Sequence, residues 1–165
     1  MSDIQKPTAA DYRRATVMTL HHRRGSTAGV LAIAQEANDA SRVPQLLKAI
    51  LVVHEVLICL LRTQSGINLL ADWVIGIAAV PPTEENSVDI SRAAKILNFH
   101  GKGNAQAIAE VMNEATLEGR PTQVFMQLLA LYEVALPELS GSGSLEWLEA
   151  QIPAILEQEG LGDEA

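Results

Sequence analysis

The two halves of this 165-residue chain share one pattern of residues. Five residue types that stand in order in residues 11–25 return in the same order 78 positions later, an offset that we call the repeat spacing. The matched pairs are Asp11/Asp89, Arg14/Arg92, Ala15/Ala93, His22/His100 and Gly25/Gly103. Ordered identities at one spacing are the signature of a repeated structural unit, so we expect the chain to fold as two copies of one architecture.

The match continues beyond Gly25 with two changes of register. Ala-Ile-Ala at 32–34 matches residues 107–109 at a spacing of 75, which predicts a three-residue insertion at 27–29. The spacing returns to 78 after a second predicted insertion near 117–119, where Gln45 matches Gln123 and Leu51 matches Leu129. The predicted organisation is an N-terminal tail at 1–7, a first repeat at 8–82, a link at 83–87, a second repeat at 88–159 and a C-terminal tail at 160–165.

Helix start and stop residues punctuate each predicted repeat. Thr8 and Asp11 have the spacing of a capping box, and Gly25 suits the left-handed residue that follows a helix. A third helix would end at Gly66, and a fourth helix at 69–80 would stop before two prolines. No stretch of five residues alternates as a half-buried strand does. The predicted fold class is all-α, with about eight helices in two tandem four-helix repeats, as a helical bundle or a short α-solenoid.

Residues 92–121 resemble the helical hairpin of the tetratricopeptide family. Phe99 lies at an aromatic site of that motif, Gly103 at its turn, Ala115 at a small packing site and Pro121 near its closing proline. The usual tryptophan, leucine and glycine of the first helix are absent, and the first repeat has a histidine at the aromatic site. The resemblance implies stacked α-hairpins with a concave surface that binds peptides.

The third helix of the first repeat is apolar over most of its surface. Lys48, Glu55 and Arg62, each seven residues apart, share one narrow stripe, and nearly every other residue at 46–61 is apolar. Such a helix is either central in its own unit or completes its burial against a partner chain.

The fourth helix of this repeat is equally apolar, with Asp72 as its one charge. We expect a homodimer that buries the third or the fourth helix, with Trp73 and Val74 as contact residues of the fourth. The alternative is that the two repeats cover these faces within one chain, which would leave a monomer.

Basic residues gather in the first predicted helix and form a candidate interaction site. They are Arg13, Arg14, His21, His22, Arg23 and Arg24. The other interpretation is a solvated helix end whose positive charge meets the negative end of the helix dipole. The net charge of −8 argues against nucleic acid as a partner. Adjacent histidines point about 100° apart on a helix, so no metal site is expected.

Charge is divided unevenly along the chain. Residues 1–80 hold eight Lys/Arg and six Asp/Glu, whereas residues 81–165 hold four and fourteen. The two repeats would therefore present faces of opposite charge, which indicates that they meet different partners.

No residue pattern predicts catalysis or a cofactor. Glu55 and Glu133 recur in apolar surroundings, and a buried carboxylate pair could transfer protons, but Lys48 on the same stripe favours ordinary exposure. His54 faces the apolar side of its helix and is expected in the core. Cys59, the only cysteine, is expected to be a reduced core residue.

These observations favour a non-enzymatic protein–protein interaction or adaptor module. Two alternatives stay open: a small nucleic-acid-linked regulator that uses the basic residues of the first repeat, and an enzyme with a pocket between the repeats. The first eight residues lack the apolar segment of a signal peptide, and the stretch Ala49–Leu61 is shorter than the roughly 20 residues that cross a bilayer. We therefore expect a cytoplasmic protein that does not bind membranes.

Overall fold

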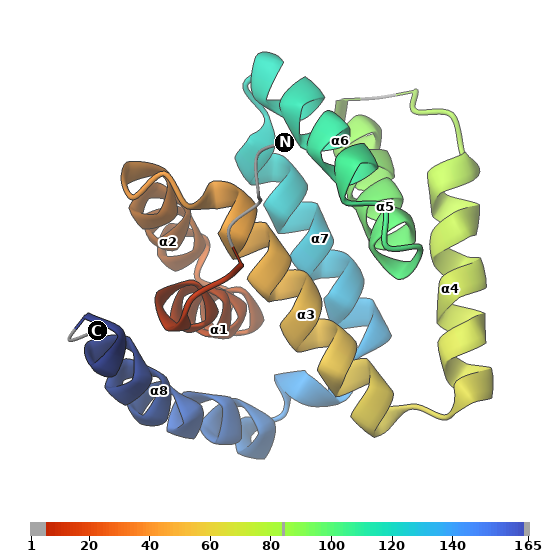
Figure 1. The fold of residues 1–165 in the computed structure, drawn as a ribbon. Helices are drawn as coiled ribbons and strands as arrows, with labels where there is room; N and C mark the ends of the chain where they lie inside the picture. Colours follow the sequence, from red (N-terminus) through yellow and green to blue (C-terminus); the bar gives the residue numbers. More distant parts are fainter. Residues whose placement is uncertain (1–5, 84, 164–165) are drawn as a thin grey trace. The chain divides into compact units, whose positions relative to one another are not determined.

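A computed structural model describes residues 6–83 and 85–163, and within these ranges the chain is all-α (Figure 1). The eight α-helices and one 3₁₀ turn found there confirm the predicted fold class, and no strand occurs in the same ranges. The elements are α1 (Ala9–Arg23), α2 (Thr27–Asp39), α3 (Val43–Leu61), α4 (Gln64–Ala79), α5 (Glu85–Gly101), α6 (Ala105–Leu117), α7 (Pro121–Ala135), η1 (Pro137–Ser140) and α8 (Ser142–Asp163).

The helices pack as two compact units. The first unit combines the chain up to His54 with the segment from Leu136 onward, and in it α1 packs against α2 and α8. The second unit is Glu55–Ala135, in which α5 packs against α4, α6 and α7. These units do not follow the predicted repeat boundaries, because α8 joins the first helices of the chain and α4 joins the helices after it. The repeat boundaries at 82 and 88 stay a prediction.

Helices α2 and α6 begin and end at positions separated by the repeat spacing. Ser26 caps α2 by accepting a hydrogen bond from the Gly29 amide at 3.2 Å, and Asn104 caps α6 by accepting one from the Ala107 amide at 3.1 Å. Residues 27–29 are thus the first turn of α2, so both predicted insertions and the spacing of 75 are wrong. The repeated Ala-Ile-Ala sequence therefore does not mark equivalent positions, whereas the capping residues Ser26 and Asn104 keep the spacing of 78.

The turns around these helices use left-handed backbone at the same spacing. Gly25 and Gly103 have φ of 75° and 68°, as predicted for the residue that follows a helix. Ser41 has φ of 55°, and its counterpart at the repeat spacing, Gly119, has φ of 72°. A serine in this region is strained where a glycine is not, because its Cβ approaches the following carbonyl group.

The boundary between α3 and α4 differs from its prediction. Thr63 caps α4 by accepting a hydrogen bond from the Gly66 amide at 3.2 Å, so Gly66 lies in the first turn of α4 and does not end α3. Helix α4 therefore begins at Gln64 and not at Leu69. Its end is as expected, because Val80 turns to extended backbone before Pro81.

Apolar side chains of α1, α2, α3, α5 and α7 form the cores of the two units. Leu51 on α3 and Leu129 on α7 are fully buried, as their equivalent positions predict. Small buried residues lie at Ala37 and Ala115, whereas Ala32 and Ala109 of the matched Ala-Ile-Ala segments are exposed. The fully buried large side chains are Met18, Val30, Leu46, Ile50, Leu51, Ile96, Val124, Leu128, Leu129 and Leu136.

Candidate interaction surfaces

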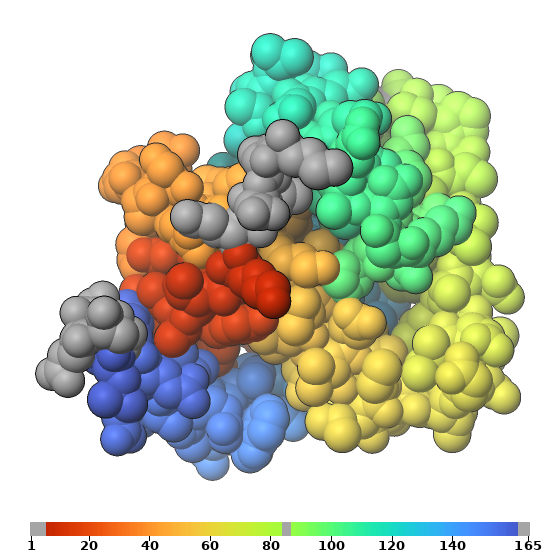
Figure 2. Space-filling model, viewed as in Figure 1, coloured from red at the N-terminus to blue at the C-terminus, as the bar shows by residue number. Residues whose placement is uncertain are grey.

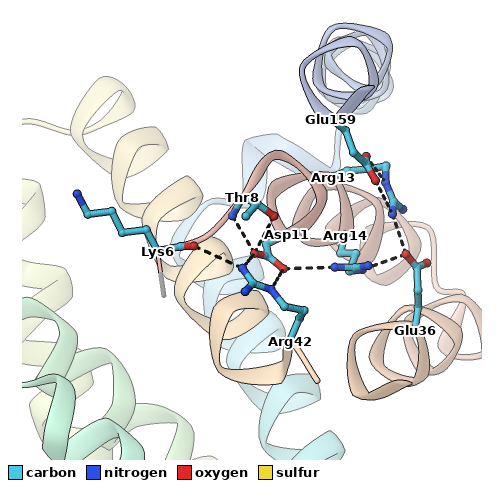
Figure 3. Close-up of polar contacts among 8 residues, drawn as sticks. All are labelled: Lys6, Thr8, Asp11, Arg13, Arg14, Glu36, Arg42 and Glu159. Atoms are coloured by element: carbon cyan, nitrogen blue, oxygen red, sulfur yellow. Dashed lines mark hydrogen bonds and ion pairs between the residues drawn. The ribbon is translucent and has the colours of Figure 1, made fainter. Parts of the chain in front are cut away.

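A buried carboxylate, Asp11, links α1 to Arg42, the residue directly before α3 (Figure 3). The Arg42 guanidinium donates to both of its carboxylate oxygens, Arg14 donates to Oδ1 at 3.3 Å, and the Thr8 amide donates to Oδ2 at 2.8 Å. The last contact is the predicted capping-box bond. Burial alone would raise the pKa of Asp11, but the hydrogen bonds from Arg42 and Thr8 outweigh it, so the pKa lies below its ordinary value.

The same arrangement recurs in the second unit. Arg120 lies 31 residues after Asp89, as Arg42 lies 31 residues after Asp11, and its Nε donates to both Asp89 oxygens at 3.1 Å. Arg92 takes the place of Arg14, with its Nη2 2.8 Å from the Glu118 carboxylate and its Nε 3.4 Å from Glu114. These ion pairs join elements within each unit, and in the first unit the buried Asp11 carboxylate pairs with both Arg14 and Arg42.

Carboxylates of α2 and α8 neutralise the other arginines of the predicted basic site. Arg13 lies between Glu36, 2.7 Å away, and Glu159, 2.9 Å away (Figure 3). Arg24 pairs with Glu149 at 2.8 Å. The hydrogen bond from Arg13 lowers the pKa of Glu36, and Arg14 acts in the same direction.

The remaining members of the predicted basic site are partly or fully covered. Arg23 is buried, and its Nη1 donates to the Leu136 carbonyl at 2.8 Å and to the Ser140 hydroxyl at 3.0 Å. His21 and His22 are half-buried. A Cβ at Gly29 would overlap the His21 ring, so this glycine permits α1 and α2 to approach. The six basic residues are thus close to one another at α1, but residues of α2 and α8 bind to them or cover them.

Sequence reasoning found the arginines of this site but not their acidic partners. Glu36, Glu149 and Glu159 lie 22 to 146 residues away from the arginines that they bind. The excess of acidic residues after position 80 pointed to Glu149 and Glu159, and no sequence signal pointed to Glu36.

Helix α4 is composed mainly of apolar residues and buries none of its side chains completely. Trp73 and Val74, the predicted contact residues, are half-buried together with Ile67, Leu70 and Ile77. This spacing of three and four residues makes one stripe, and α5 is the helix against which α4 packs. Figure 2 shows α4 at the surface beside α5.

The opposite stripe of α4 faces water. We call it the outer face of α4 and define it by the exposed residues of the helix: Gln64, Ser65, Asn68, Leu69, Ala71, Asp72, Ile75, Gly76 and Ala79. The Leu69 side chain is 71% exposed, and Asp72 is the one charge on this face. On the last turns of α3, Leu60 is 74% exposed and Val56 is also exposed. In the second unit, six of the eight exposed large apolar side chains lie at 56–80.

Three titratable groups that the sequence singled out have distinct surroundings. His54 is fully buried, as predicted, and its Nδ1 lies 2.8 Å from the Ile50 carbonyl, which fixes the proton on Nδ1. Tyr132, its counterpart at the repeat spacing, is also buried, and burial together with the charge of Glu55 raises its pKa. Glu55 itself is exposed and lies 2.7 Å from His100 Nε2.

Of the sequence expectations about α3 and α7 side chains, that for Cys59 is wrong, and the ordinary exposure expected for Glu55 is confirmed. Cys59 is exposed and not in the core, because it lies on the last turns of α3, where few side chains surround the helix. Glu133 is half-buried while Glu55 is exposed, so the two do not form a buried carboxylate pair. Within the described ranges no group of three His, Cys, Asp or Glu side chains could hold a metal ion.

Among the described helices, α3 alone has the length and composition of a membrane span. An 18-residue window of this 19-residue helix has a mean hydropathy of 1.9, and 39% of the window is buried within the chain. The core helix of a soluble protein meets the same criteria. Leu46, Ile50 and Leu51 are buried by neighbouring helices while Lys48 faces water, which supports the prediction that α3 is a core helix.

Comparisons with protein-family models, with curated proteins and with solved structures find no match to this chain. The tetratricopeptide resemblance of residues 92–121 therefore has no support beyond the helical hairpin itself, which α5 and α6 form. The residues and their geometry alone carry the argument about function.

Proposed function

We propose that this chain is a non-enzymatic protein–protein interaction module whose docking surface is the outer face of α4. One observation carries the proposal: a 16-residue apolar helix has no fully buried side chain and exposes Leu69 and Ile75 to water. Contiguous exposed apolar surface is unfavourable in water unless another surface covers it.

The chemistry of this face selects an apolar partner surface. With Asp72 as the only charge, the face offers few ion pairs for recognition, so affinity would come from burial of aliphatic side chains. A second copy of the chain supplies a surface of the same kind, and a symmetric contact between two α4 faces needs no charge complementarity. The partner that we propose first is therefore a second copy, which gives the homodimer expected from the sequence.

Two further features support the proposal over its alternatives. Glu36, Glu149 and Glu159 occupy the arginines that a nucleic-acid regulator would use. Glu55 is exposed and hydrogen-bonded to His100, so it is not the buried carboxylate that an enzyme with a pocket between the repeats would use. The exposed, single thiol of Cys59 suits a reducing compartment, so we place the protein in the cytoplasm.

Light scattering on the purified chain at micromolar concentration tests this function. The wild type should have a mass near twice 17.7 kDa. Leu69→Glu and Ile75→Glu should each shift the mass to that of a monomer, because a buried carboxylate in the contact has no partner. Leu117→Glu is the matched control: Leu117 is 90% exposed on α6, outside the outer face of α4, and its substitution should leave the dimer intact.

Two results would contradict the proposal. A wild-type mass near 17.7 kDa would reject the homodimer. A dimer that survives Leu69→Glu and Ile75→Glu would show that α4 is not the contact.

A further inference from the structure

The exposed residues of α4 are arranged symmetrically about the middle of the helix. Helix α4 spans Gln64–Ala79, so its midpoint lies beside Asp72. On both sides of Asp72, exposed residues recur three, four and seven positions away, which is the spacing of one helix side. The pairs are Leu69 and Ile75, Asn68 and Gly76, and Ser65 and Ala79. Seven of the nine residues of the outer face of α4 thus form one set that is centred on Asp72.

Large and small residues of this set complement each other in an antiparallel pair of helices. At 1.5 Å per residue, Leu69 lies about 4.5 Å before Asp72, and Gly76 lies about 6 Å after it on the same flank. Asn68 and Ile75 are related in the same way on the other flank. A second α4 that runs in the opposite direction, with its Asp72 at the same level, therefore brings Leu69 of one copy beside Gly76 of the other.

Gly76 has no packing role within the described part of its own chain. A Cβ at this position would have no neighbour within 4 Å outside the backbone of its own helix. A glycine inside a helix lowers helix stability relative to alanine, so its presence calls for a contact that alanine would hinder. Close approach of a second helix is such a contact.

The electrostatics of the helix ends favour the same antiparallel direction. The first turn of α4 holds no acidic residue and its last turn holds no basic residue, so no charged side chain in these turns offsets the helix dipole. In an antiparallel pair, the positive end of each helix lies beside the negative end of the other. A parallel pair would place like ends together.

Asp72 is the residue that this arrangement places against its own copy. The two carboxylates meet at the centre of an otherwise uncharged face, where like charges repel. No ion pair joins Asp72 to another described residue of the second unit, so neither copy brings a cation to this point. The carboxylates therefore oppose the contact that the aliphatic side chains around them favour.

We propose that a second copy docks antiparallel on the outer face of α4, with Leu69 of each copy beside Gly76 of the other, and that Asp72 limits the affinity by meeting its own counterpart. This inference rests on the proposed function and adds the orientation of the partner. Asp72 is then the specificity-determining residue of the contact, because a helix that presents a positive charge at this level would bind more tightly than a second wild-type copy does.

Charge exchange at position 72 tests the central contact, with analytical ultracentrifugation as the measurement. Asp72→Asn should self-associate about tenfold more tightly than the wild type, because like charges no longer meet. An equimolar mixture of the wild type and Asp72→Lys should form a heterodimer about tenfold more tightly than either chain forms a homodimer. Glu110→Lys is the matched control: Glu110 is exposed on α6, and its mixture with the wild type should show no such gain.

Engineered thiols test the orientation, in a chain that carries Cys59→Ser and so has no other thiol. Asp72→Cys should form a disulfide-linked dimer on mild oxidation. Ser65→Cys alone should not, because its two copies lie about 21 Å apart in the antiparallel pair, too far for a disulfide. A mixture of Ser65→Cys and Ala79→Cys should cross-link, and far-UV circular dichroism checks that each variant keeps its helices.

Two results would overturn this docking geometry and leave the proposed function intact. In both, Leu69→Glu dissociates the dimer. In the first, Ser65→Cys cross-links to itself, which indicates a parallel pair. In the second, the wild type, Asp72→Asn and the charge-exchange mixture associate with equal affinity. A chain that stays monomeric in all these forms, Asp72→Asn included, would overturn the proposed function as well.

Discussion

At the scale of single residues, His54 makes the stability of the chain depend on pH. Burial lowers the pKa of this imidazole from 6.5 to about 4, and the hydrogen bond to the Ile50 carbonyl only partly offsets the effect. Between these two values the unfolded chain binds a proton that the folded chain does not bind. The free energy of unfolding should therefore fall by about 3 kcal/mol as the pH falls from 7 to 4.

Urea denaturation at pH 7, 5.5 and 4 measures this loss. In His54→Leu the loss between pH 7 and pH 4 should largely disappear. Among the described residues, the carboxylates of Asp11 and Glu36 also have a lowered pKa, but they lose their stabilising charge only as the pH falls below their ordinary values. A variant whose stability falls with pH as steeply as the wild type does would contradict the assignment to His54.

The apolar periodicity of the sequence correctly predicted which side chains are buried in those parts of a helix that other elements pack against. The apolar arc of α3 placed Leu51 and His54 in the core, and both are fully buried. Cys59 belongs to the same apolar arc but is exposed. The arc predicts towards which side of the helix a side chain points. It does not predict over what length of the helix other elements pack against that side.

At the scale of helices, the Asp11 and Asp89 ion pairs should be the strongest local determinants of stability. Each carboxylate is buried and receives hydrogen bonds from an arginine further along the chain, so its removal leaves a covered guanidinium without its charge partner. Asp11→Ala and Asp89→Ala should each lower the free energy of unfolding by about 3 kcal/mol, and by similar amounts.

Glu114→Ala is the control for this prediction. Its carboxylate pairs with Arg92 from a largely exposed position, so the loss should be within about 1 kcal/mol in the same urea titrations. Losses below about 1 kcal/mol for both aspartate variants would show that the ion pairs do not anchor the helices.

Local spacing could predict helix ends but not these ion pairs. The capping box of Thr8 and Asp11 was readable because its partners are three residues apart. The Asp11–Arg42 pair could not be predicted in this way, because the two residues are 31 positions apart in the sequence and only the packing of the helices brings them together. Gly66 was misread because a glycine within the first turn of a helix and one after its last turn look the same in a sequence.

At the scale of the whole molecule, the sequence predicted helices in the right order but not their neighbours. Helix α4 packs against α5 and α8 packs against α1, so each predicted fourth helix lies against the first helix of the other predicted repeat. Apolar periodicity identifies a face that must be covered and leaves open which helix covers it. The basic residues of α1 and the acidic residues of α8 indicated that these two helices attract each other. In the sequence this was visible only as a difference in net charge between the two halves of the chain.

The predicted duplication has a direct test in an experimental structure of the chain. Helices α1–α3 should superpose on α5–α7 with every residue at the repeat spacing, so that His22 lies over His100 and Gly25 over Gly103. The physical reason is that the caps, the left-handed turns and the buried aspartate–arginine pairs all recur at this spacing, and together they determine where each helix begins and how it meets the next. The test also extends beyond the residues that suggested it, since Ser41 should coincide with Gly119 despite their different side chains. A crystal structure in which these pairs fall at unrelated positions, or in which the helices superpose only at another spacing, would show that the matched residues are a coincidence of helix punctuation.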